Sequence, residues 1–68
     1  MNYDYANPFL EVTFPNGNII RINKKIIKTI KQLNSSESTY VIIWVEGDSY
    51  RFDGTLEEFD KNSRTIFI

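Results

Sequence analysis

Apolar and polar side chains alternate on both sides of a turn sequence between residues 9 and 22, FLEVTFPNGNIIRI. This alternation predicts strands, because successive side chains of a strand point to opposite faces. Proline suits the second position of a type I turn and glycine the left-handed position after it, which favours a three-residue loop at 15–17. The predicted cross-strand pairs are Leu10 with Ile22, Glu11 with Arg21, Val12 with Ile20 and Phe14 with Asn18.

A second hairpin is predicted between residues 39 and 53, which contain the run YVIIWVEGDSYRF. Glycine in the first place of a two-residue loop favours a type II′ turn at Gly47 and Asp48. The pairs expected from this turn are Val45 with Tyr50, Trp44 with Arg51 and Ile43 with Phe52. The guanidinium of Arg51 would then stack on the indole of Trp44.

Residues 23–33, NKKIIKTIKQL, have a helical period. Asn23 is a suitable N-cap, and the lysines would occupy the polar side of the helix. We therefore expect a short amphipathic helix that packs on one face of the sheet. The apolar residues on its inner stripe, within about a third of the circumference, are Ile26, Ile27, Ile30 and Leu33.

The TLEE run at 55–58 matches a capping box, which predicts a single helical turn presenting Leu56 and Phe59. The alternative is a strand that runs into a turn at 61–63. In either case residues 64–68, RTIFI, alternate as a strand does.

Together these segments predict an α+β fold in the order β-β-α-β-β-β. It would be a small antiparallel sheet or half-open barrel of about five strands, with the helix packed on one face. We expect residues 1–68 to form a single domain with an irregular N-terminal segment at 1–8. The expected core consists of Leu10, Val12, Phe14, Ile20, Ile22, Val41, Ile43, Val45, Tyr50 and Phe52 together with the apolar stripe of the helix.

The composition argues against catalysis. The chain contains no cysteine and no histidine, so it lacks a thiol nucleophile, an imidazole base and the usual zinc ligands. Glu57, Glu58 and Asp60 are close in sequence, but acids in the first turn of a helix more often complement its dipole than bind a cation. We therefore expect no enzymatic activity, no cofactor and no metal site.

No targeting segment is visible in the sequence. The start, MNYDYANPFL, lacks a basic segment followed by an apolar run, and no apolar stretch approaches the roughly 20 residues of a membrane helix. We expect a cytoplasmic protein that does not contact a membrane. The heavy use of Asn, Ile and Lys is typical of AT-rich bacterial or phage genes.

Basic residues are concentrated in the predicted helix, although the net charge of the chain is −1. On a helix, Lys24, Lys25, Lys28 and Lys31 would form a ladder that could follow the phosphates of a nucleic acid. Two of them would lie in the first helical turn, where the helix dipole disfavours cations. The alternative is a solvated face, or one that docks on the acidic half of the protein, which a pI near 5.2 favours.

The second apolar face of the 40–45 strand is the main candidate site, because something must cover it. The N-terminal segment with Tyr3 and Tyr5 could do so within a small barrel, and so could a second copy or another protein. The candidate partner-binding residues are Tyr40, Ile42, Trp44 and Arg51. Since Trp, Tyr and Arg are the usual anchors of interfaces, we predict a small non-enzymatic protein-binding module, a candidate bacterial or phage regulator or inhibitor. The alternatives are RNA or single-stranded DNA binding through the lysines, and a structural homo-oligomer such as a homodimer.

Residues 54–68, GTLEEFDKNSRTIFI, are similar to the Gly-x-Leu-x-x-Phe-Asp core of the Sm and Hfq RNA-binding family. In that family a helix precedes the first strand, as the helix expected at 23–33 precedes Tyr40. Arg64 stands where many Sm proteins have asparagine, so the residue that contacts uridine is not matched. Because the second Sm motif is also missing, this similarity does not assign the chain to the family.

Overall fold

The structure is a computed structural model that describes residues 7–68. In this range the chain forms six β-strands, one short α-helix and one 3-10 turn. The strands are β1 (Pro8–Thr13), β2 (Ile19–Asn23), β3 (Ile27–Asn34), β4 (Thr39–Val45), β5 (Asp48–Asp53) and β6 (Ser63–Phe67). The 3-10 turn η1 (Lys24–Ile26) lies between β2 and β3, and the helix α1 (Leu56–Lys61) lies between β5 and β6.

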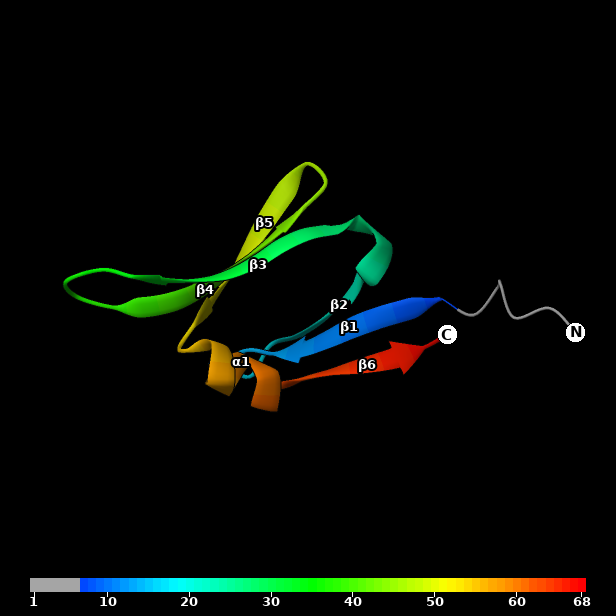
Figure 1. The fold of residues 1–68 in the computed structure, drawn as a ribbon. Helices are drawn as coiled ribbons and strands as arrows, with labels where there is room; N and C mark the ends of the chain where they lie inside the picture. Colours follow the sequence, from blue (N-terminus) through cyan, green and yellow to red (C-terminus); the bar gives the residue numbers. More distant parts are fainter. Residues whose placement is uncertain (1–6) are drawn as a thin grey trace, which may run out of the picture.

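The strands form two antiparallel sheets, a first sheet with the order β2-β1-β6 and a second sheet with the order β3-β4-β5. η1 carries the chain from the first sheet to the second, and α1 carries it back (Figure 1). The described residues therefore form a small, mostly β domain without a closed barrel. Two packed sheets replace the expected single sheet with a helix on one face.

The register predicted for the first hairpin is confirmed. Leu10 lies opposite Ile22, Glu11 opposite Arg21 and Val12 opposite Ile20. The three-residue loop is closed by a hydrogen bond that Phe14 N donates to Asn18 O at 2.7 Å. Gly17 has φ +93°, the left-handed conformation for which glycine was expected. β1 begins at Pro8, inside the segment expected to be irregular, and residues 1–6 of that segment lie outside the described range.

The register predicted for the second hairpin is wrong by two residues. Val45 pairs with Asp48, so the loop consists of residues 46–47. Gly47 has φ +77° and occupies the second loop position, whereas a type II′ turn requires glycine in the first. Because side chains alternate with a period of two, the slip changes every cross-strand partner but leaves each side chain on its predicted face.

The helix predicted at 23–33 is wrong. Only residues 24–26 form a 3-10 turn, which Asn23 caps by accepting a hydrogen bond from Lys25 N at 2.9 Å. Residues 27–34 form β3 and pair with β4, with a bulge at Lys28. The physical reason lies in the IIKTI run at 26–30, since β-branched side chains lose rotamer freedom in a helix and fit the pleated surface of a sheet.

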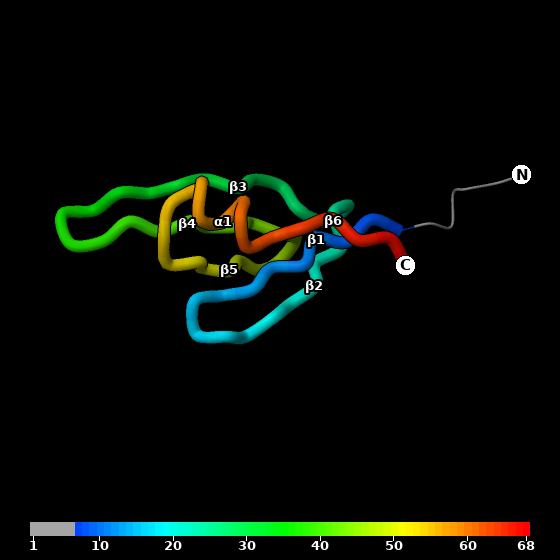
Figure 2. The backbone as a smooth tube through the Cα atoms, turned by 90° about the horizontal axis from the view of Figure 1, so that it is seen from below, coloured from blue at the N-terminus to red at the C-terminus, as the bar shows by residue number. Residues whose placement is uncertain are grey.

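The capping box predicted at the start of α1 is confirmed. Thr55 Oγ1 accepts a hydrogen bond from Glu58 N at 3.1 Å, and Glu58 Oε1 accepts one from Thr55 N at 2.8 Å. Phe59 is buried and meets Phe52 edge to face, with 5.4 Å between ring centroids. Through this contact α1 packs on the second sheet, and Figure 2 shows it lying across β4.

Both sheets and α1 contribute to one hydrophobic core. The buried residues are Leu10, Val12, Ile22, Val41, Ile43, Val45, Phe52 and Phe59. The partly buried residues packed against them are Phe14, Ile20, Ile26, Ile27, Ile30 and Tyr50. Apart from Leu33, every residue of the expected core is either buried or packed against the buried residues. The alternation along a strand determines which face a side chain lies on, and this does not depend on which residue it pairs with. Leu33 was placed in the core by the helical period, and in β3 it lies on the other face of the sheet, opposite Tyr40.

Candidate functional site

The second sheet buries one face and presents the other outside the core. Along β4, Val41, Ile43 and Val45 are at most 5% exposed, and the residues between them point to the opposite side. The cross-strand register extends that side over β3 and β5. We call it the outer face, and its members are Thr29, Lys31 and Leu33 on β3, Tyr40, Ile42 and Trp44 on β4, and Ser49, Arg51 and Asp53 on β5.

An apolar patch occupies the middle of the outer face. It consists of Leu33, Tyr40, Ile42 and Trp44, all of them partly exposed. None of these side chains belongs to the core cluster or packs against it. The structure therefore places Tyr40, Ile42 and Trp44 together on one side of the sheet, as predicted. It adds Leu33, which the sequence analysis had assigned to the inner stripe of a helix. The apolar residues of β3 recur at every third position, 27, 30 and 33, so no alternation of apolar and polar residues predicts the face of Leu33.

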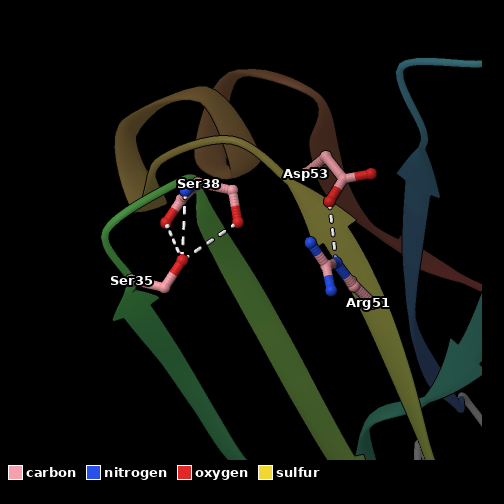
Figure 3. Close-up of polar contacts among 4 residues, drawn as sticks. All are labelled: Ser35, Ser38, Arg51 and Asp53. Carbon is pink, nitrogen blue, oxygen red and sulfur yellow. Dashed lines mark hydrogen bonds and ion pairs between the residues drawn. The ribbon is translucent and has the colours of Figure 1, made fainter.

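Arg51 lies on the outer face but does not stack on Trp44 as predicted. The two-residue slip places Ser49 opposite Trp44, and the guanidinium carbon of Arg51 lies 3.9 Å from the ring centroid of Tyr40. Arg51 Nε also donates a hydrogen bond to Asp53 Oδ1 at 2.8 Å (Figure 3). The Arg51 side chain remains 52% exposed, so part of the guanidinium is accessible to a ligand.

The turn between β3 and β4 fixes the register that brings Leu33 beside Tyr40. Ser35 N donates a hydrogen bond to Ser38 O at 2.8 Å, and Ser35 Oγ accepts one from Ser38 N at 3.0 Å. Figure 3 shows this serine pair at the end of the sheet where Arg51 and Asp53 also lie. The serine-rich sequence thus forms a tight turn at one border of the outer face.

The lysines do not form the ladder that a helix would have produced. Lys24 and Lys25 lie in η1, and Lys28 lies at the bulge of β3. Lys24 Nζ donates a hydrogen bond to Thr65 Oγ1 on β6, at 3.0 Å. Of these four lysines, the register places Lys31 on the outer face, opposite Ile42.

The outer side of the first sheet carries an ion-pair network centred on Glu11. Arg21 Nε lies 3.0 Å from Glu11 Oε2, and Arg64 Nε lies 2.7 Å from Glu11 Oε1. These two hydrogen bonds, above all that from Arg64, lower the pKa of Glu11 below its ordinary value. The pair with Arg21 was predicted, whereas the contact with Arg64 depends on the pairing of β1 with β6, which local sequence does not reveal.

A shallow hollow of about 320 Å³ adjoins this network, and its lining consists of Glu11, Thr13, Lys61, Asn62, Ser63 and Arg64. The carboxylate in its wall is already paired with two arginines. The hollow therefore offers no free general base, and its chemistry is that of a salt-bridged surface.

The acids of α1 have structural partners. Glu58 belongs to the capping box, and Glu57 lies 3.8 Å from Lys61 one turn later. Within residues 7–68, no three potential metal-ligating side chains of His, Cys, Asp or Glu come together. None of the helices in the same range has the length and apolar content needed to cross a bilayer.

No protein-family model matches this chain, and no curated protein or solved structure is significantly similar to it. The motif similarity at 54–68 gains no support from the fold, since the helix expected before Tyr40 is the strand β3. Tyr3 and Tyr5, considered as a cover for the aromatic side chains, lie outside the described residues.

Proposed function

We propose that this protein is a small non-enzymatic binding module that recognises another protein through the outer face of the second sheet. The observation that carries the proposal is the apolar patch, in which four large side chains on two adjacent strands lie outside the core. Isolated exposed apolar residues are ordinary, but a contiguous group rimmed by polar residues is typical of an interaction site. A role as a cytoplasmic regulator or inhibitor of bacterial or phage origin is consistent with such a module.

The residue types favour a protein as the partner. Trp44, Tyr40 and Arg51 belong to the residue classes that dominate interface hot spots, and the patch has a polar rim formed by Thr29, Ser49 and other short or charged side chains. A strand platform holds these anchors rigidly, so little conformational entropy is lost when a partner binds. We also infer that the two sheets, joined through η1, act as a half-open barrel with the outer face as one wall.

The test is affinity capture from a bacterial lysate with the full chain and with the variant Trp44→Ala. Capture of a partner that the variant loses supports the proposal, whereas a variant that stays folded and keeps every partner contradicts it. The matched control is Ile19→Ala, which removes a 60% exposed apolar side chain from the first sheet and should leave capture unchanged. Light scattering on both proteins distinguishes a partner protein from a second copy.

A second candidate function is single-stranded nucleic-acid binding, and the row Lys31–Ile42–Arg51 favours it. This row places a cation on each side of β4, between the rings of Tyr40 and Trp44. Cations that contact phosphates beside aromatic rings that stack bases are the usual elements of such sites.

This alternative predicts that immobilised single-stranded RNA or DNA retains the protein at low salt and that retention falls as salt is raised. Lys31→Glu combined with Arg51→Glu should abolish retention. The control Lys25→Glu removes a cation of η1 and should have a smaller effect. Absence of retention at low salt would eliminate nucleic acid as the ligand.

A further inference from the structure

The free edge of β6 carries backbone groups that no residue of the described range satisfies through strand pairing. β6 lies at one end of the first sheet, and its strand partner is β1 (Figure 1). Thr13 N donates a hydrogen bond to Asn62 O at 2.8 Å, and Ile68 N donates one to Asn7 O at 3.1 Å. In an antiparallel ladder such bonds recur at every second residue, so residues 62, 64, 66 and 68 face β1. The N–H and C=O groups of Ser63, Thr65 and Phe67 therefore point away from the sheet.

The residues of β6 whose backbone groups point outward carry none of the charges that usually prevent a free strand from pairing with another chain, and Arg64 of the same strand is paired with Glu11. β5 carries Asp48, Arg51 and Asp53, and β3 carries Lys28 and Lys31. Soluble proteins protect edge strands with charges of this kind. In β6 the residues with outward backbone groups are uncharged, and Phe67 is 69% exposed. The edge of β6 is thus suited to adding a strand.

Lys24 of η1 places a positive charge beside this edge, so the edge favours an acidic partner. Lys24 Nζ donates a hydrogen bond to Thr65 Oγ1 at 3.0 Å, so a positive charge lies next to the central residue of the free edge. The carboxylate of Glu11 lies on the opposite face of the sheet, where it is paired with Arg64, and it does not neutralise that charge. If β6 paired with β6 of a second copy about Thr65, two Lys24 ammonium groups would approach each other. An acidic side chain at the same place would instead be attracted.

We propose that the free edge of β6 binds an extended segment of a partner protein, with an acidic residue of that segment opposite Thr65. Residues directly opposite each other in an antiparallel pair have Cβ atoms about 4.5–5.5 Å apart. A carboxylate in that position comes within reach of the Lys24 ammonium group. Main-chain hydrogen bonds provide the binding, and Lys24 selects the acid.

The test is a titration of the full chain with two capped peptides, TVEVT and its charge-reversed control TVKVT, followed by amide NMR. TVEVT should shift the amide signals of Thr65 and Phe67 and bind about fivefold more tightly than TVKVT. Lys24→Gln should remove this preference, and the control Lys25→Gln should preserve it. Thr65→Pro deletes an outward N–H without removing a bond to β1 and should abolish binding, and Phe67→Pro is the substitute if that variant does not fold.

Equal binding of the two peptides, or no shifts at Thr65 and Phe67, overturns the proposal. A dimer of the full chain that Thr65→Pro converts to monomer also overturns it, because a second copy would then occupy the edge. The result is independent of the proposed function, since Trp44→Ala changes the apolar patch of the second sheet and should leave peptide binding at β6 unchanged.

Discussion

The two sheets differ in the residues at the centre of the face that points away from the core. In the first sheet the central strand β1 presents Glu11, and the neighbouring strands each place an arginine directly opposite it. In the second sheet the central strand β4 presents Tyr40, Ile42 and Trp44, which have no comparable partners across the strands. A charged centre with its own counter-ions is complete within one chain, whereas an apolar centre gains free energy when something else covers it.

The largest expected effect separates the two faces of β4. Ile43 is fully buried, and its replacement by alanine should lower the free energy of unfolding by about 2–5 kcal/mol. Ile42 is the next residue along the chain but lies on the outer face, so Ile42→Ala should cost about 1 kcal/mol or less. Urea denaturation of both variants measures this difference. Equal losses would show that the patch is as well covered as the core.

The second effect concerns the junction between the two sheets at Gly54. Its φ of +146° is unfavourable for other residues, and an added Cβ would lie 2.8 Å from Glu58 Oε1 and 3.1 Å from a ring carbon of Phe52. Gly54→Ala should therefore destabilise the protein by about 1–3 kcal/mol. Because both sheets share one core, thermal melts followed by far-UV circular dichroism and by Trp44 fluorescence should shift together. Separate shifts would indicate that the sheets unfold independently.

The third effect is the pH dependence of the Glu11 network. The folded-state pKa of Glu11 is lowered by its hydrogen bonds with Arg64 and Arg21. The network therefore stabilises the fold fully above the unfolded-state pKa of about 4.3, and this contribution is lost as the pH falls through the folded-state pKa. Glu11→Gln should remove this part of the acid sensitivity in urea titrations at neutral and acidic pH. The control Glu37→Gln, in the exposed turn between β3 and β4, should retain it.

The smallest effect tests the contact between Arg51 and Tyr40 on the outer face. The stacking of Arg51 on Tyr40 at 3.9 Å should contribute about 0.5–1 kcal/mol at this exposed position. Arg51→Gln should lower the free energy of unfolding by that amount, and Lys31→Gln should leave it nearly unchanged. If the two variants were equally stable, the aromatic contact would contribute nothing to the fold.

Sequence reasoning succeeded where local chemistry determines the geometry. In the first hairpin, Pro15 and Gly17 specify one loop, and the charge pair of Glu11 with Arg21 supports the same register. The capping box at Thr55 is equally local. The faces of β4 were also predicted correctly, since a slip of two residues does not move a side chain across the sheet.

It failed where the spacing of apolar residues fitted two periods. The isoleucines at 26, 27 and 30 suit a helical stripe, and the choice of strand depends on pairing with β4, which is a tertiary effect. One local signal did point to the right answer. Lys24 and Lys25 would have opposed the dipole at the start of a helix, and in the 3-10 turn followed by a strand they do not. Sequence reasoning also missed that Leu33 and Lys31 adjoin the candidate site, because they reach the outer face only when residues 27–34 form a strand.

The pairing of β1 with β6 determines when this molecule can fold. Glu11 and Arg64 are neighbours in space although most of the sequence separates them, so the first sheet closes a long loop of chain. Contacts of such high sequence separation slow the search for the native state. During synthesis, β1 can pair with β2 early, but its other edge stays unpaired until residues 63–67 emerge from the ribosome.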